Sequence, residues 1–294
     1  MMQPDITQPN NYRIDEAKYK SLLKYIRLSV TEKYEFPQEI VQIDDVTIAT
    51  IGNFSASTGK PKSKKTFNVS AIVASALSGK EVLKYKAELP SCKNRILYID
   101  TEQSKCHCHK VLHRILKLAG LPTDQENDNI QFLVLREYTP DQRRDIIRWA
   151  LHEEQNIGLV IIDGIRDLIH DINSPSESLD IINELMRWSS YYELHIHTVL
   201  HLNKGDDNTR GHIGTELNNK AETILQISKN NENGRISEVK AMHIRDREFT
   251  PFAFEIGEDS LPHLVKDHQF KKNKMDRLVS YTDMTEQQHR TALE

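Results

Sequence analysis

The chain has 294 residues, a formal net charge of -4 at pH 7 and three cysteines. This slightly acidic balance excludes the overall basic surface of a protein that binds nucleic acid on every face, so any such contact must come from local loops. No stretch reaches the roughly 18 apolar residues of a membrane span, and the N-terminus lacks a signal-peptide core. The small number of cysteines indicates a reducing compartment. We therefore expect a cytoplasmic protein without membrane contact.

Two elements are predicted near the N-terminus. Apolar residues recur at helical spacing between Asp15 and Glu32, which predicts an amphipathic helix. The run Val46–Ile51 is rich in β-branched residues and predicts a buried strand. We expect this strand to lead directly into the loop that follows.

Residues 59–66, GKPKSKKT, match a phosphate-binding loop at all but one position. The pattern G-x-x-x-x-G-K-[ST] needs backbone N–H groups that cradle phosphates, a lysine for the β- and γ-phosphates and a hydroxyl for Mg²⁺. Gly59, Lys65 and Thr66 hold the required spacing, and Lys64 replaces the second glycine. The alternative is an exposed basic turn. The expected nucleotide-binding residues are Gly59, Ser63, Lys64, Lys65, Thr66 and Phe67.

Beyond the loop, helical patterns alternate with apolar strands, which predicts an α/β fold with a mostly parallel sheet and helices on both faces. The expected helices span 66–78, 104–119, 140–155 and 177–190, and the expected strands 95–99, 130–135, 158–162 and 195–201. Short strands joined by turns follow from about residue 222, at 222–228, 236–244 and 252–256, and predict an antiparallel C-terminal edge.

Two of these strands end in carboxylates. Strand 158–162 ends at Asp163, and a rigid strand can deliver such a carboxylate to Mg²⁺ beside the loop. Aspartate is also a frequent turn former, which is the alternative. Strand 95–99 is followed by Asp100 and Glu102. A carboxylate just past a strand can orient and deprotonate an attacking water, and Glu102 is the candidate; the alternative is that both acids only begin the next helix.

Polar and basic residues follow the later strands. Strand 195–201 ends in His201, which can sense a γ-phosphate, although a core histidine is the alternative. Downstream, Arg245 and Arg247 are two residues apart on a strand, so they project to the same face and can bind phosphate. The alternative is a solvated edge strand with local ion pairs.

The run Cys106-His107-Cys108-His109 has the residue types of a metal site. On a helix, however, these neighbours spread around the axis, and no second pair lies at the spacing of a zinc site. The sequence therefore disfavours a metal site here.

Taken together, residues 46–256 resemble the RecA-like ATPase superfamily, in particular its plasmid-type RepA helicase branch and mobile-element relatives. LYIDTE resembles the family strand that ends in the catalytic glutamate, which implies that role for Glu102. LVIIDG resembles the Walker B strand, which implies that Asp163 coordinates Mg²⁺ through water. RDREFTPF resembles a segment whose two basic residues act across the subunit interface, which implies that role for Arg245 and Arg247.

The segment VLHLNKG…RGHIGTEL resembles the family's sensor strand and the mobile loop after it. This makes His201 and Asn203 sensor candidates. Lys204 and Arg210 become candidates for contact with nucleic acid.

The resemblance implies a RecA-like P-loop NTPase core, which is one of three parts of the chain. We expect an N-terminal helical extension at 1–45, a RecA-like ATPase domain at 46–265, and at 266–294 a linker with the start of a further module. It implies ATP and Mg²⁺ as cofactors, a homo-oligomer in the form of a hexameric ring or a filament, and DNA as a partner.

The expected function is therefore ATP hydrolysis coupled to DNA replication or mobilisation of a plasmid or mobile element. In that mechanism Lys65, Glu102, His201 and the two downstream arginines take part in catalysis. One alternative is a nucleotide-binding regulator or adaptor that hydrolyses little or no ATP; Lys64 favours it and Glu102 opposes it. A second is a structural α/β protein that binds no nucleotide.

Overall fold

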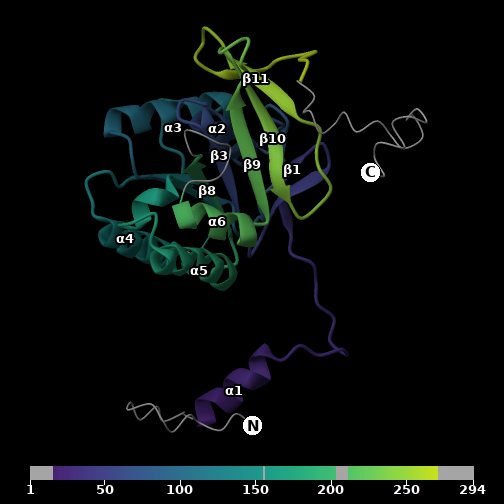
Figure 1. The fold of residues 1–294 in the computed structure, drawn as a ribbon, viewed down its shortest axis with the longest axis vertical. Helices are drawn as coiled ribbons and strands as arrows, with labels where there is room; N and C mark the ends of the chain where they lie inside the picture. The colour runs from purple at the N-terminus through teal and green to yellow at the C-terminus, as the bar shows by residue number, and fades with distance from the viewer. Residues whose placement is uncertain (1–15, 155, 203–210, 271–294) are drawn as a thin grey trace, which may run out of the picture. The chain divides into compact units, whose positions relative to one another are not determined.

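The computed structural model describes residues 16–154, 156–202 and 211–270 (Figure 1). The chain divides into two units, residues 1–36 and 37–294.

The first unit contains helix α1 (Glu16–Ile26). The helix ends before the expected Glu32, because the chain forms a local turn in which the Ser29 hydroxyl accepts a hydrogen bond from the Thr31 amide at 3.3 Å. Such side-chain bonds to the backbone compete with helical ones. The apolar stripe lies on the surface of this unit: Leu23 is 59% and Ile26 61% exposed.

In the described part of the second unit, nine strands form one sheet in the order β12-β11-β10-β9-β3-β8-β7-β5-β6. The strands are β3 (Phe54–Gly59), β5 (Arg95–Asp100), β6 (Ile130–Val134), β7 (Ile157–Asp163), β8 (His195–His201), β9 (Thr223–Lys229), β10 (Ile236–Ile244), β11 (Phe252–Ile256) and β12 (Pro262–Leu264). The six from β9 to β6 run parallel, and β10, β11 and β12 pair antiparallel. The predicted α/β class, parallel sheet and antiparallel C-terminal edge are confirmed.

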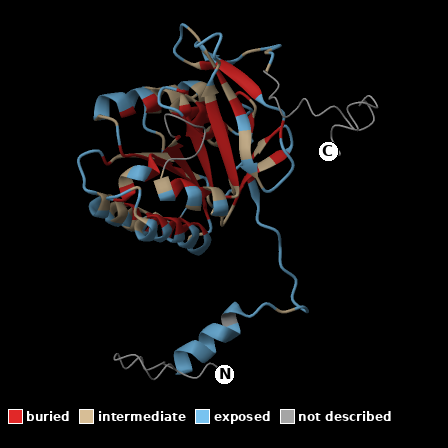
Figure 2. Cartoon of the chain, viewed as in Figure 1, coloured by how far each residue is buried: buried red, intermediate tan, exposed pale blue. Residues whose placement is uncertain are grey.

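Helices cover both faces of this sheet (Figure 1). They are α2 (Lys65–Ser78), α3 (Lys105–Ala119), α4 (Pro140–Glu153), α5 (Pro175–Tyr191), α6 (Gly211–Lys220) and the short 3-10 helix η1 (Ile165–Leu168). Side chains alternate along each strand, so Ile96 and Tyr98 of β5 pack in the core under α2 and α3, while Leu97 and Ile99 pack in the core under α4, α5 and α6. Figure 2 shows the resulting buried strands between exposed helix faces.

The strand predicted at Val46–Ile51 does not lead into the loop, and this prediction was wrong. It forms β2 (Val46–Thr50), which joins β1 (Glu39–Ile43) and β4 (Tyr85–Ala87) in a separate three-stranded sheet. The chain then turns at Gly52, whose φ of 83° favours glycine, and β3 enters the loop. β3 reads FSASTG and lies between β8 and β9, fully buried. Its small residues carry no β-branched pattern, so the sequence did not reveal it.

The region after β8 also differs from its expectation. Residues from Gly211 onward belong to α6 rather than to a mobile loop, because Ile213 and Leu217 lie one turn apart and are both buried against α5 and the sheet. The sensor candidate Asn203 and the nucleic-acid candidates Lys204 and Arg210 lie outside the described residues.

A chain of buried polar groups links β3 to β8. His195 Nε2 and His197 Nδ1 each lie 2.7 Å from the Ser55 hydroxyl, and His197 Nε2 lies 2.8 Å from the Ser57 hydroxyl. Both rings are buried, and burial lowers the pKa of His195 to about 4 and that of His197 to about 3. Both imidazoles are therefore neutral in the folded protein at neutral pH.

This burial predicts a loss of stability in weak acid. An unfolded histidine titrates near pH 6.5, so below that pH the unfolded state binds more protons than the folded state. The free energy of unfolding should fall between about pH 7.5 and pH 5, on the order of 2 kcal/mol for each ring. Urea denaturation at the two pH values measures this. Replacing the exposed His152 by Gln should leave the difference unchanged, and equal stability of the wild type at both pH values would contradict the prediction.

Candidate functional site

A cleft of about 340 Å³ lies at the carboxyl ends of the parallel strands. The loop after β3 and the start of α2 form one side, the ends of β5, β7 and β8 form its floor, and α3 contributes a wall. The sheet register pairs Asp100 with Asp163 and Gly59 with His201. Because Asp163 also pairs with Val199, the second pair lies two residues further along the same edge. Open α/β sheets bind ligands at this edge.

The loop has the backbone of a phosphate-binding loop although its second glycine is missing. A Cβ at Gly59 would lie 2.2 Å from the Ile227 carbonyl oxygen, so only glycine fits there. Lys64 takes φ 69° and ψ 32°, the left-handed conformation that a glycine would adopt freely. For a side chain this conformation costs about 1 kcal/mol. The Lys64 ammonium donates to the Arg235 carbonyl between β9 and β10, and burial followed by repulsion from Lys229 lowers its pKa.

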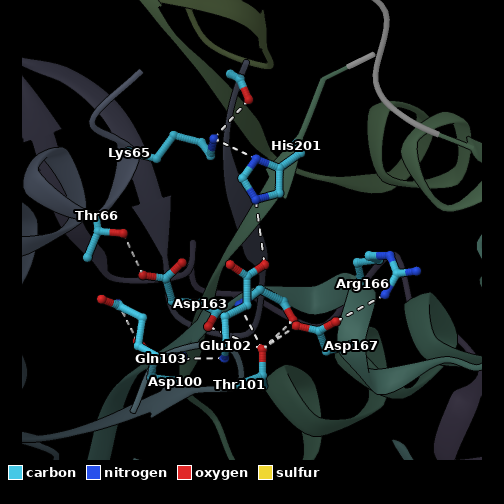
Figure 3. A network of polar contacts seen from close by, with 12 residues as sticks. Lys65, Thr66, Asp100, Thr101, Glu102, Gln103, Asp163, Arg166, Asp167 and His201 are labelled. Atoms are coloured by element: carbon cyan, nitrogen blue, oxygen red, sulfur yellow. Dashed lines mark hydrogen bonds and ion pairs between the residues drawn. The ribbon is translucent and has the colours of Figure 1, made fainter. Parts of the chain in front are cut away.

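Lys65 is buried and lines the cleft, with its ammonium beside His201 (Figure 3). Its Nζ donates to the carbonyl oxygens of Gly59 at 2.8 Å and Lys60 at 3.2 Å, and lies 2.9 Å from His201 Nδ1. Burial lowers the pKa of Lys65 to about 8, against the attraction of Asp163 and Glu102. The ammonium is thus held by neutral oxygen atoms from which a more negative group can draw it.

Thr66 and Asp163 present oxygen atoms to each other across the floor of the cleft. The Thr66 hydroxyl and the Tyr98 hydroxyl both donate to Asp163 Oδ2, each at 3.0 Å. Burial raises the pKa of Asp163 to about 6, and the nearby Asp100 adds to this rise. A divalent cation beside these oxygens would favour the charged carboxylate.

Glu102 stands at the end of β5, facing His201 (Figure 3). Its Oε1 lies 3.5 Å from His201 Nε2, and this partner, against the effect of burial, lowers the pKa of the carboxyl group. Asp100 is fully buried and accepts hydrogen bonds from the backbone amides of Glu102 at 3.0 Å and Gln103 at 2.7 Å. Asp100 therefore fixes the turn that presents Glu102.

The residues present fit Mg²⁺ and a phosphate chain. No group of three His, Cys, Asp or Glu among the described residues could hold a metal alone. Mg²⁺, however, is usually bound by one or two carboxylates together with substrate phosphates, and Thr66 with Asp163 offers such a set. In the same loop the buried Ser63 hydroxyl has no hydrogen-bond partner in the described structure, so a donor is available there.

The sequence did not reveal a group of residues that supports this site. The Thr101 hydroxyl lies 2.9 Å from Asp167 Oδ2 and 3.0 Å from the Gly164 carbonyl, which ties the end of β5 to the end of β7. Arg143 of α4 donates to the carbonyls of Thr101 at 3.2 Å and Asp167 at 2.7 Å. Arg143 and Asp167 carry no motif; the fold alone brings them here.

Arg245 and Arg247 are not part of this cleft. Ile244 at the end of β10 pairs with Thr223 at the start of β9, and β9 runs parallel to β3, so both arginines follow the opposite edge of the sheet. The seven residues of β9 separate that edge from the loop by about 20 Å. There, Arg245 Nη2 donates to the Lys220 carbonyl at 3.1 Å.

The Cys106–His109 run lies at the start of α3. Cys106 and His109 are exposed while Cys108 is buried, so the two thiols face different surroundings. His107 lines the cleft.

The parallel sheet with a phosphate-binding loop at its carboxyl edge is the architecture of a P-loop protein with a RecA-like fold. Residues 40–207, more than half of the chain, match the protein family described as AAA domain, and the chain belongs to this family. The crystal structure of the RadB recombinase is similar in fold, with a TM-score of 0.51 and 17% identity, over 73% of this chain and 91% of that one. The endoribonuclease YbeY of Fusobacterium nucleatum is 27% identical over 116 residues, 36% of this chain and 70% of that protein.

Membership of this class implies that the protein binds a nucleotide, usually with Mg²⁺. In the part of the chain that the structure describes, none of the helices is both long and apolar enough to cross a membrane.

The left-handed backbone at Lys64 leads to a prediction. Lys64→Ala removes the hydrogen bond to Arg235 and keeps the strain, whereas Lys64→Gly removes both. The Gly variant should therefore be more stable than the Ala variant by about 1 kcal/mol. Urea denaturation compares the two. An Ala variant as stable as the Gly variant would show that the loop relaxes without positive φ.

Proposed function

We propose that this protein binds Mg·ATP in the cleft and hydrolyses it to act on DNA, in replication or mobilisation of a plasmid or mobile element, as in the RepA-type helicase branch. The observation that carries the ATPase proposal is the convergence of Lys65, Thr66, Glu102, Asp163 and His201 in one cleft. These residues come from four separate segments, and each has the chemistry that phosphoryl transfer requires.

In this proposal the loop amides and Lys65 bind the phosphates, with Gly59, Ser63, Lys64 and Phe67 shaping the loop. Lys65 exchanges two backbone carbonyls for the β- and γ-phosphate oxygens, and the gain in charge attraction offsets the lost hydrogen bonds. Mg²⁺, when bound, neutralises phosphate charge. Thr66 would hold it directly and Asp163 through water.

Glu102 takes the proton from the attacking water. Its lowered pKa keeps it ionised at neutral pH, and the turn fixed by Asp100 aims it into the cleft. His201 contacts both Lys65 and Glu102, so a phosphate that draws Lys65 away also changes the partner of Glu102. His201 can thereby report the state of the nucleotide to the segment after β8.

The proposed working unit is an oligomer, either a hexameric ring or a filament. Arg245 and Arg247 lie too far from the loop of their own subunit, which supports a role at the site of a neighbouring one. We assign contact with DNA to Lys204 and Arg210, which lie outside the described residues.

The proposed division of the chain is a helical extension at 1–45, the ATPase domain at 46–265, and a linker with the start of a further module at 266–294. A cytoplasmic location accompanies this function.

A second candidate function is a regulator or adaptor that binds ATP but hydrolyses little of it. The strained, side-chain-bearing backbone at Lys64 favours it. The ionised Glu102 at the cleft favours hydrolysis instead.

Variants of Lys65 and Glu102 test the ATPase proposal. Titration calorimetry should show Mg·ATP binding to the wild type, weakened by at least about tenfold in Lys65→Ala, because that lysine makes charge-assisted contacts. Glu102→Gln should bind ATP like the wild type and lose about 10²–10⁴-fold in turnover, with or without single-stranded DNA.

Two exposed positions provide matched controls for these variants, Lys80→Ala and Glu153→Gln, which should behave as the wild type. If Lys65→Ala binds Mg·ATP as tightly as the wild type, the proposal that ATP binds at this loop is wrong. Wild-type ATP binding without turnover would establish the regulator instead.

Mixed oligomers test the assignment of Arg245 and Arg247. The double variant Arg245→Ala/Arg247→Ala and the single variant Glu102→Gln should each be inactive alone. Mixed together, they should regain part of the ATPase activity, because some interfaces then pair an intact glutamate with intact arginines. The measurement is turnover against mixing ratio, with mixed oligomers confirmed by light scattering of differently tagged chains. Mixed oligomers without activity would exclude action across the interface.

A further inference from the structure

The α3 wall of the cleft is basic and faces the catalytic residues. His107, Lys110 and Arg114 recur at intervals of three and four residues, so they lie on one face of the helix. All three line the same cleft as Thr66 and Glu102. None of them belongs to a motif of the phosphate-binding loop.

Arg114 is the inner member of this row and is held in place by its neighbours. Its guanidinium carbon lies 3.6 Å from the centre of the Phe67 ring, and Phe67 directly follows Thr66. Such stacking on an aromatic face orients a cation and leaves its edge for other partners. The stack therefore fixes the guanidinium against the first turn of α2, at the side of the cleft.

The hydrogen-bond donors of Arg114 are poorly satisfied. Its Nε and Nη1 atoms are buried without a hydrogen-bond partner in the described structure. Neither Arg114 nor Lys110 forms an ion pair with a described residue, whereas the half-buried Arg95 and Arg144 are paired with Glu154 and Glu184. A buried charged donor without a partner is costly, and a bound oxygen anion removes that cost.

The charge of the cleft points to the same kind of ligand. Five cationic side chains line it against two carboxylates, Glu102 and Asp163. Lys64 is held by the Arg235 carbonyl and Lys65 by loop carbonyls and His201, so the loop residue Lys62 and the two α3 cations, Lys110 and Arg114, are available for a ligand. A planar guanidinium with an ammonium beside it matches the several oxygens of a phosphate.

We propose that Arg114 and Lys110 form a subsite for a terminal phosphoryl group, within the same subunit as the loop. The group is the γ-phosphate of bound ATP or free inorganic phosphate beside bound ADP. The subsite rests on the proposed nucleotide binding and adds a cationic contact that no neighbouring subunit has to supply. ADP, which lacks this phosphoryl group, does not reach it.

The test is a comparison of two nucleotides by titration calorimetry on the full chain with Mg²⁺. Arg114→Met keeps an unbranched apolar stem against Phe67 and removes the charge, and Lys110→Gln removes the second cation. Each variant should bind a non-hydrolysable ATP analogue at least about tenfold more weakly than the wild type, while ADP affinity stays within about twofold. Lys117→Ala on the exposed side of the same helix is the matched control and should change neither affinity.

A second arm separates the two sources of the phosphoryl group. If free phosphate also binds the subsite, millimolar inorganic phosphate should strengthen ADP binding to the wild type and not to Arg114→Met. If the subsite takes only the γ-phosphate, phosphate should have no effect, while the loss of analogue binding remains.

An unchanged ratio of analogue to ADP affinity in both variants would overturn the subsite, even with normal nucleotide binding. Equal losses for the analogue and ADP would overturn it too, by showing that Arg114 only supports the loop. A wild type that binds neither nucleotide would instead overturn the proposed function, and the subsite with it.

Discussion

The parallel register of β3, β8, β7 and β5 is the constraint on which the cleft depends. Gly59 pairs with His201, and Asp100 with Asp163, so the groups that can do chemistry leave the same edge of the sheet within two residues of one another. A shift of one residue in any of these pairings would turn a side chain to the opposite face of the sheet. The apolar cores on both faces oppose such a shift, because it would move residues such as Leu97 or Ile161 out of the core in which each packs.

This arrangement places several charged groups where water is scarce. Asp100 is fully buried, and Lys65 and Asp163 are nearly so. Each is compensated locally: Asp100 by backbone amides, Lys65 by carbonyls and His201, and Asp163 by two hydroxyls. The compensation for Lys65 and Asp163 is by neutral groups, which leaves their pKa values displaced towards the uncharged forms. Charged partners would stabilise the ionised forms of Lys65 and Asp163 more strongly than these neutral groups do. The cleft is therefore suited to bind an anion at Lys65 and a cation at Asp163.

The sequence predicted the structure correctly where a residue type is typical of one structural role, such as apolar residues in a buried strand. The apolar strands that became β5, β7 and β8, and the acids and histidine at their ends, were predicted within one or two residues. It failed at β3, because the small residues of Phe54–Gly59 have the composition of a turn although the strand is fully buried between β8 and β9. Tyr98 was predicted only as a strand residue, although its hydroxyl contacts Asp163. Arg114 gave no indication of its place, since only the packing of α3 against α2 brings it to Phe67.

A loop between a strand and a helix is normally fixed at its two covalent ends. Here the last loop residue, Lys64, has a third attachment, since its side chain reaches the Arg235 carbonyl in the turn from Asn230 to Arg235. The length of that turn therefore helps to set where the loop ends and α2 begins. A residue inserted into or deleted from the turn would therefore displace the carbonyl to which Lys64 donates.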